Sequence, residues 1–98
     1  MSVSREKKRC FVTGGGRGIG RGIVEALAAS GYDVTFSYRS STDAAESLRS
    51  ELEQGFPSQN FSILRADLAF REDVDALAKE LSGWTDLYGF VHNAGGSY

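Results

Sequence analysis

The stretch Thr13-Gly14-Gly15-Gly16-Arg17-Gly18-Ile19-Gly20 decides how this 98-residue chain folds. It follows a short apolar run, Cys10-Phe11-Val12, and leads into a segment, 18–30, whose apolar residues recur at helical spacing. A strand that passes through glycines into a helix brings backbone N–H groups and the positive end of the helix dipole to one place, where they favour a phosphate. We therefore expect a diphosphate site at this turn.

The spacing of the glycines distinguishes this loop from two other phosphate-binding turns. A P-loop requires Gly-Lys-Ser/Thr after its last glycine, whereas Gly20 is followed by Arg21. The pattern Gly-x-Gly-x-x-Gly would need a glycine at position 19 or 21, and neither is one. What remains is Gly-x-x-x-Gly-x-Gly, in which Gly14 permits the turn, Gly18 permits close approach and Gly20 lets the helix pack against the sheet. A merely flexible loop is the alternative.

The rest of the chain alternates short apolar runs with amphipathic stretches. Strands are expected at 9–13, 33–38, 61–65 and 87–92. Each helix between them has an apolar stripe: Ile19, Ile23, Val24 and Leu27; Leu48 and Leu52; and Val74, Leu77, Ala78 and Leu81. We expect Gly31, Gly55 and Gly83 to end the three helices, and Asp43, with Glu46 three residues on, to cap the second.

The order βαβαβαβ with near-continuous apolar strands predicts an α/β fold, a parallel sheet with helices on its faces. Right-handed crossovers then give the strand order 3-2-1-4, with the topological switch between the first and fourth strands. Ligands in such doubly wound sheets bind beyond the carboxyl ends of the strands at that switch. We expect the functional site there.

Three motifs in register carry a resemblance to a known family. The glycine loop, 13–20, is followed by Asp67-Leu68 after the third strand and by Asn93-Ala94-Gly95 after the fourth. Together they resemble the cofactor motifs of short-chain dehydrogenases/reductases, from about residue 8 to the last. Within that family, Gly15-Gly16-Arg17-Gly18-Ile19-Gly20 is most similar to the 3-oxoacyl-(acyl-carrier-protein) reductase-like branch.

The resemblance implies a Rossmann-type doubly wound sheet, truncated after strand 4. Residues 1–8 are then an N-terminal lead-in, and 9–98 the N-terminal part of a single NADP-binding domain. The cofactor-binding residues implied are Gly14, Gly15, Gly16, Arg17, Gly18, Ile19, Gly20, Arg39, Ser40, Asp67, Leu68, Asn93, Ala94 and Gly95. The reaction implied is hydride transfer between nicotinamide and a carbonyl/alcohol pair. Its Ser, Tyr and Lys are expected downstream, because Tyr98 is too close to the fourth strand, so no catalytic residue is assigned here.

The residues after the second strand favour NADP over NAD. A site for NAD usually places an acid there, about 20 residues beyond the glycines, to bind the ribose hydroxyls. Here the segment 37–41 reads Ser-Tyr-Arg-Ser-Ser, with no acid before Asp43. Arg39 can clamp a 2′-phosphate with its planar fork, Ser40 can donate a further hydrogen bond, and Arg17 can approach from the other side. The alternative is that Arg39 is only a surface charge.

Two residues have competing interpretations. His92 stands where the 3-oxoacyl reductase-like branch often has a second Asn. Because a neutral imidazole can donate one hydrogen bond and accept another, we interpret it as a structural stand-in in preference to a catalytic residue. Asp67, or a residue just after it, could simply cap the third helix. Its place beyond a strand end at the switch favours the adenine contact.

The composition of the chain limits the kinds of partner and the compartment that we expect for the protein. A net charge of −2 gives no reason to expect nucleic acid or an anionic membrane, and no apolar run approaches the roughly 20 residues of a membrane span. The start of the chain lacks the apolar core of a signal peptide, and the single cysteine, Cys10, suits a reducing compartment; we expect a cytoplasmic protein. One His and one Cys make no convincing zinc site.

The expected partners are a small-molecule or acyl-carrier-bound carbonyl substrate, the C-terminal half of the protein, and further copies in a homo-oligomer. A non-catalytic NADP-binding module, or a structural fragment, is the alternative to an enzyme. An epimerase or dehydratase of the extended relatives is a third reading, but it would expect Gly-x-x-Gly-x-x-Gly, which Arg17 contradicts.

Overall fold

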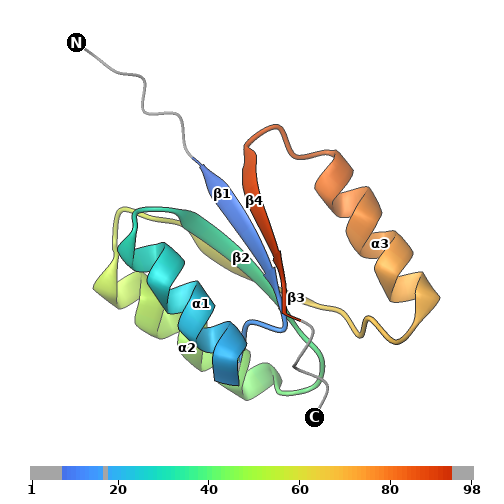
Figure 1. The fold of residues 1–98 in the computed structure, drawn as a ribbon. Helices are drawn as coiled ribbons and strands as arrows, with labels where there is room; N and C mark the ends of the chain where they lie inside the picture. Colours follow the sequence, from blue (N-terminus) through green and yellow to red (C-terminus); the bar gives the residue numbers. More distant parts are fainter. Residues whose placement is uncertain (1–7, 17, 94–98) are drawn as a thin grey trace.

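The computed structural model describes residues 8–16 and 18–93 as a parallel sheet with helices (Figure 1). The strands are β1 (Arg9–Thr13), β2 (Asp33–Tyr38), β3 (Phe61–Arg65) and β4 (Leu87–His92). The helices are α1 (Gly18–Ala29), α2 (Thr42–Gly55) and α3 (Arg71–Ser82). The strands are parallel in the order β3-β2-β1-β4. The predicted fold class, strand bounds and strand order are confirmed.

The main core lies between the sheet and the pair α1 and α2, which an ion pair between Arg21 and Glu51 also joins. Alternate residues of the strands point to this side because side chains in a strand have a period of two. Val12 of β1 and Phe36 of β2 are fully buried there, against Val24 of α1. Figure 1 shows α3 apart from this pair, on the β4 side of the sheet.

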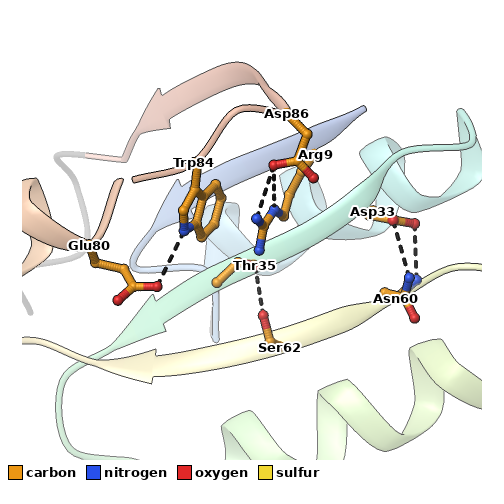
Figure 2. Close-up of polar contacts among 8 residues, drawn as sticks. All are labelled: Arg9, Asp33, Thr35, Asn60, Ser62, Glu80, Trp84 and Asp86. Atoms are coloured by element: carbon orange, nitrogen blue, oxygen red, sulfur yellow. Dashed lines mark hydrogen bonds and ion pairs between the residues drawn. The ribbon is translucent and has the colours of Figure 1, made fainter. Parts of the chain in front are cut away.

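An aromatic and ionic cluster lies where β1 meets the segment after α3 (Figure 2). The guanidinium of Arg9 is 3.4 Å from the centroid of the Trp84 ring and 2.9 Å from a carboxylate oxygen of Asp86. The indole N–H of Trp84 donates to Glu80 over 3.2 Å, and its ring lies 6.0 Å from that of Phe11. These contacts connect the end of α3 to β1.

Polar side chains of β2 and of the segment that includes β3 pair with one another. The hydroxyls of Thr35 and Ser62 are 2.6 Å apart, and the backbone and side-chain amides of Asn60 donate to the carboxylate of Asp33 (Figure 2). Asp33 and Thr35 are buried. Their polar groups are thus paired within the sheet.

The helix ends agree with the prediction in three cases and differ in one. α1 ends in backbone hydrogen bonds from Gly31 to Ala28 and from Tyr32 to Leu27, and α2 and α3 end at Gly55 and just before Gly83. The prediction that Asp43 caps α2 is wrong, because the helix begins at Thr42 and Ser41 holds the N-cap position. Asp43 instead lies in the first turn, where its negative charge interacts favourably with the positive end of the helix dipole.

Two predicted apolar stripes are only partly buried. Ile19 is 75% exposed, because it lies at the open start of α1 beside the glycine loop. In α3 only Leu77 is buried, and Val74 is 41% exposed. β4 is the edge strand on that side of the described sheet, so side chains of α3 that reach past it meet solvent. No helix in 8–16 and 18–93 has the length and apolar character to cross a membrane.

Candidate functional site

A cleft of about 230 Å³ opens at the carboxyl ends of all four strands. Its walls come from residues 13–14 at the end of β1, 37–39 at the end of β2, 66–69 after β3 and 92–93 at the end of β4. These segments are far apart in the sequence. They meet because parallel strands end at the same edge of the sheet, which is the placement that the strand order predicts.

Hydrogen bonds join β1 and β4 at the floor of this cleft. Thr13 and His92 are partners in the register of β1 and β4. The backbone N–H of Asn93 donates to the Thr13 hydroxyl over 2.9 Å, and the Asn93 side-chain amide donates to the Gly14 carbonyl over 3.2 Å. The Thr13 hydroxyl also lies 3.2 Å from Nδ1 of His92. Asn93 therefore fixes the start of the glycine loop to β4.

The first glycines of the loop use their N–H groups within the fold. Gly14 donates to the Ser37 hydroxyl over 3.1 Å and Gly15 to the Ser37 carbonyl over 3.0 Å. A methyl group on Gly15 would lie 2.6 Å from Cβ of Phe36, so this residue is packed against β2. Gly14 and Gly15 thus shape the turn and use these N–H groups within the protein.

Gly18 and Gly20 have different surroundings. Gly18 has a φ of +58°, and nothing lies within 4 Å of the place where a Cβ would be. A Cβ on Gly20 would be 2.0 Å from the Gly14 carbonyl oxygen and 2.6 Å from the Asn93 side-chain nitrogen. Gly20 therefore lets α1 approach the loop and Asn93 at the end of the sheet, while Gly18 leaves one side of the loop open.

The turn after β2 supplies the cationic side of the cleft. Arg39 lines the cleft and is exposed, and Ser40 is exposed beside it but does not line it. Among the residues that the structure describes, no ion pair of Arg39 is found. Its guanidinium is available to an anion, and no carboxylate stands between Ser37 and Thr42 to compete.

Asp67 does not cap the third helix. Phe70 is the N-cap residue of α3, whereas the Asp67 carboxylate accepts the backbone N–H of Ala69 over 3.0 Å. Asp73, in the first turn of α3, accepts the backbone N–H of Asp67 over 2.7 Å. The capping alternative for Asp67 is therefore wrong. Asp67 and Leu68 both line the cleft, half-buried.

The residues assigned from the sequence fall into three groups. Those in the walls of the cleft are Gly14, Arg39, Asp67, Leu68 and Asn93. Those in the loop or turns beside it are Gly15, Gly16, Gly18, Ile19, Gly20 and Ser40. Arg17, Ala94 and Gly95 lie outside the described residues.

Two hydroxyl residues of the site are not in the sequence-based set. Thr13 and Ser37 are both 2% exposed, and each holds a backbone N–H of the loop or of Asn93. The signal for them is the presence of a hydroxyl near the carboxyl end of an otherwise apolar strand. Such a group must find a hydrogen-bond partner when it is buried, and here the partners belong to the site.

A family model described as short chain dehydrogenase matches residues 8–98. The chain belongs to the short-chain dehydrogenase family. Its sequence is 40% identical over 90 residues to the 3-oxoacyl-[acyl-carrier-protein] reductase FabG of Staphylococcus aureus, strain Mu50. This match covers 90% of the chain and 35% of FabG. The sequence is 36% identical over 91 residues to the uncharacterized oxidoreductase YmfI of Bacillus subtilis, strain 168, covering 93% of the chain and 36% of YmfI. The chain thus spans about a third of the length of these relatives.

Solved structures of other proteins share the fold, and the first of them is a short-chain dehydrogenase. One from Sphingobium yanoikuyae, in complex with NADPH, matches with a TM-score of 0.78 and 23% identity over 85% of this chain and 32% of that one. FolM alternative dihydrofolate reductase 1 from Brucella suis, in complex with NADP, matches with a TM-score of 0.65 and 35% identity over 76% and 30%. The resemblance drawn from the three motifs is confirmed, including its similarity to the 3-oxoacyl reductase-like branch.

Proposed function

We propose that this chain is the NADP(H)-binding part of an oxidoreductase that transfers hydride between nicotinamide and a carbonyl/alcohol pair. The observation that carries the proposal is Arg39 in the wall of the cleft, with no acid between Ser37 and Thr42. A guanidinium favours the 2′-phosphate that distinguishes NADP from NAD, and a carboxylate at this point would repel it.

The residues of the cleft fit such a nucleotide. The open side of the loop at Gly18 leaves room for a diphosphate at the amino end of α1. Asp67 and Leu68 would hold the adenine edge from the β3 side, and Arg39 and Ser40 the 2′-phosphate from the β2 side. Asn93, whose side chain already holds the Gly14 carbonyl, would keep the loop in register with β4. Arg17, Ala94 and Gly95 complete the proposed set.

The nicotinamide would supply or accept the hydride, and the residues of this chain would bind and orient the nucleotide. The Ser, Tyr and Lys that handle the substrate proton are proposed to lie beyond this chain.

The substrate class is proposed from the relatives. FabG acts on an acyl-carrier-bound substrate by its name, so we propose a small-molecule or acyl-carrier-bound carbonyl for the complete protein. We further propose that it is a cytoplasmic homo-oligomer, in which Cys10 remains a thiol.

Nucleotide titration of the complete protein tests this proposal. NADPH should bind more tightly than NADH, and Arg39→Asp should reverse that order, because it removes charge-assisted hydrogen bonds worth about 1.5–3 kcal/mol. Lys79→Asp, in the last turn of α3, makes the same charge change at an exposed position outside the cleft and should leave the order intact. Equal affinities unaltered by Arg39→Asp would refute the NADP assignment, and tight binding without turnover of any carbonyl would favour a non-catalytic binding module.

A further inference from the structure

His92 is an exposed side chain in the wall of the cleft with no role in the proposed function so far. It is the last residue of β4 and pairs in register with Thr13, at the topological switch between β1 and β4. From the sequence alone it is interpreted as a structural stand-in for Asn. Its hydrogen bonding indicates more than that.

The Thr13 hydroxyl favours one tautomer of His92. A backbone N–H can only donate, so the 2.9 Å contact from Asn93 makes the Thr13 oxygen an acceptor. The hydroxyl proton of Thr13 is then directed elsewhere, and Nδ1 of His92, 3.2 Å away, is the acceptor beside it. Thr13 is 2% exposed, so its hydroxyl has little access to water as a substitute. Donation from Thr13 to Nδ1 gives that buried proton an acceptor, and this arrangement favours the neutral tautomer of His92 that is protonated at Nε2.

In this tautomer, the Nε2–H group of His92 is available to donate a hydrogen bond to a ligand. Within residues 8–16 and 18–93, no hydrogen bond to this nitrogen is found. It lies on the opposite side of the ring from Nδ1, on a residue that borders the cleft. A donor in this position suits an oxygen of a bound ligand.

We infer that His92 donates a hydrogen bond from Nε2 to an oxygen of the bound nucleotide, and that Thr13 holds it in the tautomer that can do so. This inference rests on the proposed function and adds a binding residue to it. In the order β2-β1-β4, His92 is two strand spacings, or about 10 Å, from β2, after which Arg39 follows. His92 should therefore serve the part of the nucleotide that NADP and NAD share, and not the 2′-phosphate.

Calorimetric titration of the complete protein with NADP⁺ and with NAD⁺ tests the inference. His92→Phe keeps a ring of similar size and removes the donor, so it should weaken both nucleotides by about three- to tenfold and leave their ratio unchanged. His92→Asn, which can accept from Thr13 and donate into the cleft, should recover most of the loss. His92→Phe also leaves the buried Thr13 hydroxyl without its Nδ1 acceptor, so its thermal unfolding midpoint should fall slightly, and His92→Asn, which can accept from Thr13, should restore it.

A double-mutant cycle tests the part played by Thr13. Thr13→Val should weaken binding of both nucleotides less in the His92→Phe background than in the unaltered protein, because only the part of its effect that passes through the imidazole is then lost, while the part through the Asn93 N–H remains. Should His92→Phe bind both nucleotides within twofold of the unaltered protein while Arg39→Asp still changes their ratio, the inference is wrong and the proposed function stands. Weakening of NADP⁺ alone would also overturn it. If the unaltered protein binds neither nucleotide, the proposed function itself fails.

Discussion

Gly18 is the residue on which the proposed diphosphate site depends most directly. Its φ of +58° lies in the left-handed region, where a residue with a Cβ is strained, and the space beside it is open. A side chain here would meet no atom of the described protein, but it would stand in the space through which a diphosphate approaches the loop. The conformation and the open space both call for glycine.

Gly18→Val should therefore abolish nucleotide binding while the sheet still forms. The strain of a β-branched residue at this φ is on the order of 1–2 kcal/mol, which lowers stability without unfolding the protein. The measurement is calorimetric titration with NADPH, with circular dichroism to follow the fold. Retained affinity would mean that the glycine loop does not hold the phosphates.

Cys10 provides a second test at the residue scale. Its thiol is 3% exposed, and burial raises the pKa of Cys10 above its ordinary value. Because the thiolate is the reactive form, iodoacetamide should leave Cys10 unlabelled in the native protein at pH 8 and label it after unfolding in guanidinium, as peptide mass spectrometry would show. The raised pKa also means that the stabilising effect of the buried neutral thiol is lost as the pH rises through that pKa. Rapid labelling of the native protein would contradict this burial.

Residues that stand out in the local sequence could be named as site candidates from the sequence. Residues that act through tertiary contacts could not. Gly18, Arg39 and Asp67 are conspicuous because a glycine, a cation or an acid stands in the few residues that follow an apolar strand. Thr13 and Ser37 are ordinary strand residues by propensity. Their importance comes from backbone groups that the fold brings to them, which no local pattern records.

At the scale of elements, the strands and the ends of the helices followed the pattern of apolar residues and glycines, and the packing of α3 did not. The period of an apolar stripe predicts that a helix forms, but the extent of its burial depends on the layer against which it packs. α2 lies over the sheet with Leu48 and Leu52 buried, whereas α3 lies beside the edge strand with only Leu77 buried. The same kind of stripe therefore leads to different burial.

The contact between α1 and the glycine loop can be tested with a matched pair of substitutions. Gly20→Ala places a Cβ 2.0 Å from the Gly14 carbonyl oxygen, so α1 must shift, and the free energy of unfolding should fall by about 1–3 kcal/mol. Gly22→Ala, in the same helix, has nothing within 4 Å and should be neutral or stabilise by up to about 1 kcal/mol. Denaturant unfolding of both variants gives the comparison. Equal stability of the two would show that α1 does not approach the loop as described.

At the scale of the whole molecule, the sheet is covered unevenly. The side against α1 and α2 has a continuous core, while β4 is an edge strand with Tyr88 58% and Phe90 48% exposed. An apolar edge strand presents unpaired N–H and C=O groups to other chains. Each large side chain left in water forgoes about 1.5–3 kcal/mol of burial, against a typical net stability of about 5–15 kcal/mol.

Residues 1–98 alone should therefore fold poorly or self-associate. Sedimentation velocity and thermal unfolding, followed by the fluorescence of the single tryptophan, Trp84, would show a concentration-dependent size and a broad transition. Phe90→Lys, which places a charge on the edge strand, should reduce the association. A monodisperse monomer with one cooperative transition would contradict the prediction.

The claim that joins these scales is that the nucleotide lies in the cleft at the carboxyl ends of the strands. Hydrogen–deuterium exchange of the complete protein, with and without NADPH, tests it most directly. We predict slower exchange in the bound state at four segments, 14–20, 37–40, 66–69 and 92–95, with α2 from Glu46 to Glu53 unchanged. Protection that spares these four segments while NADPH is bound would contradict the assignment of the site.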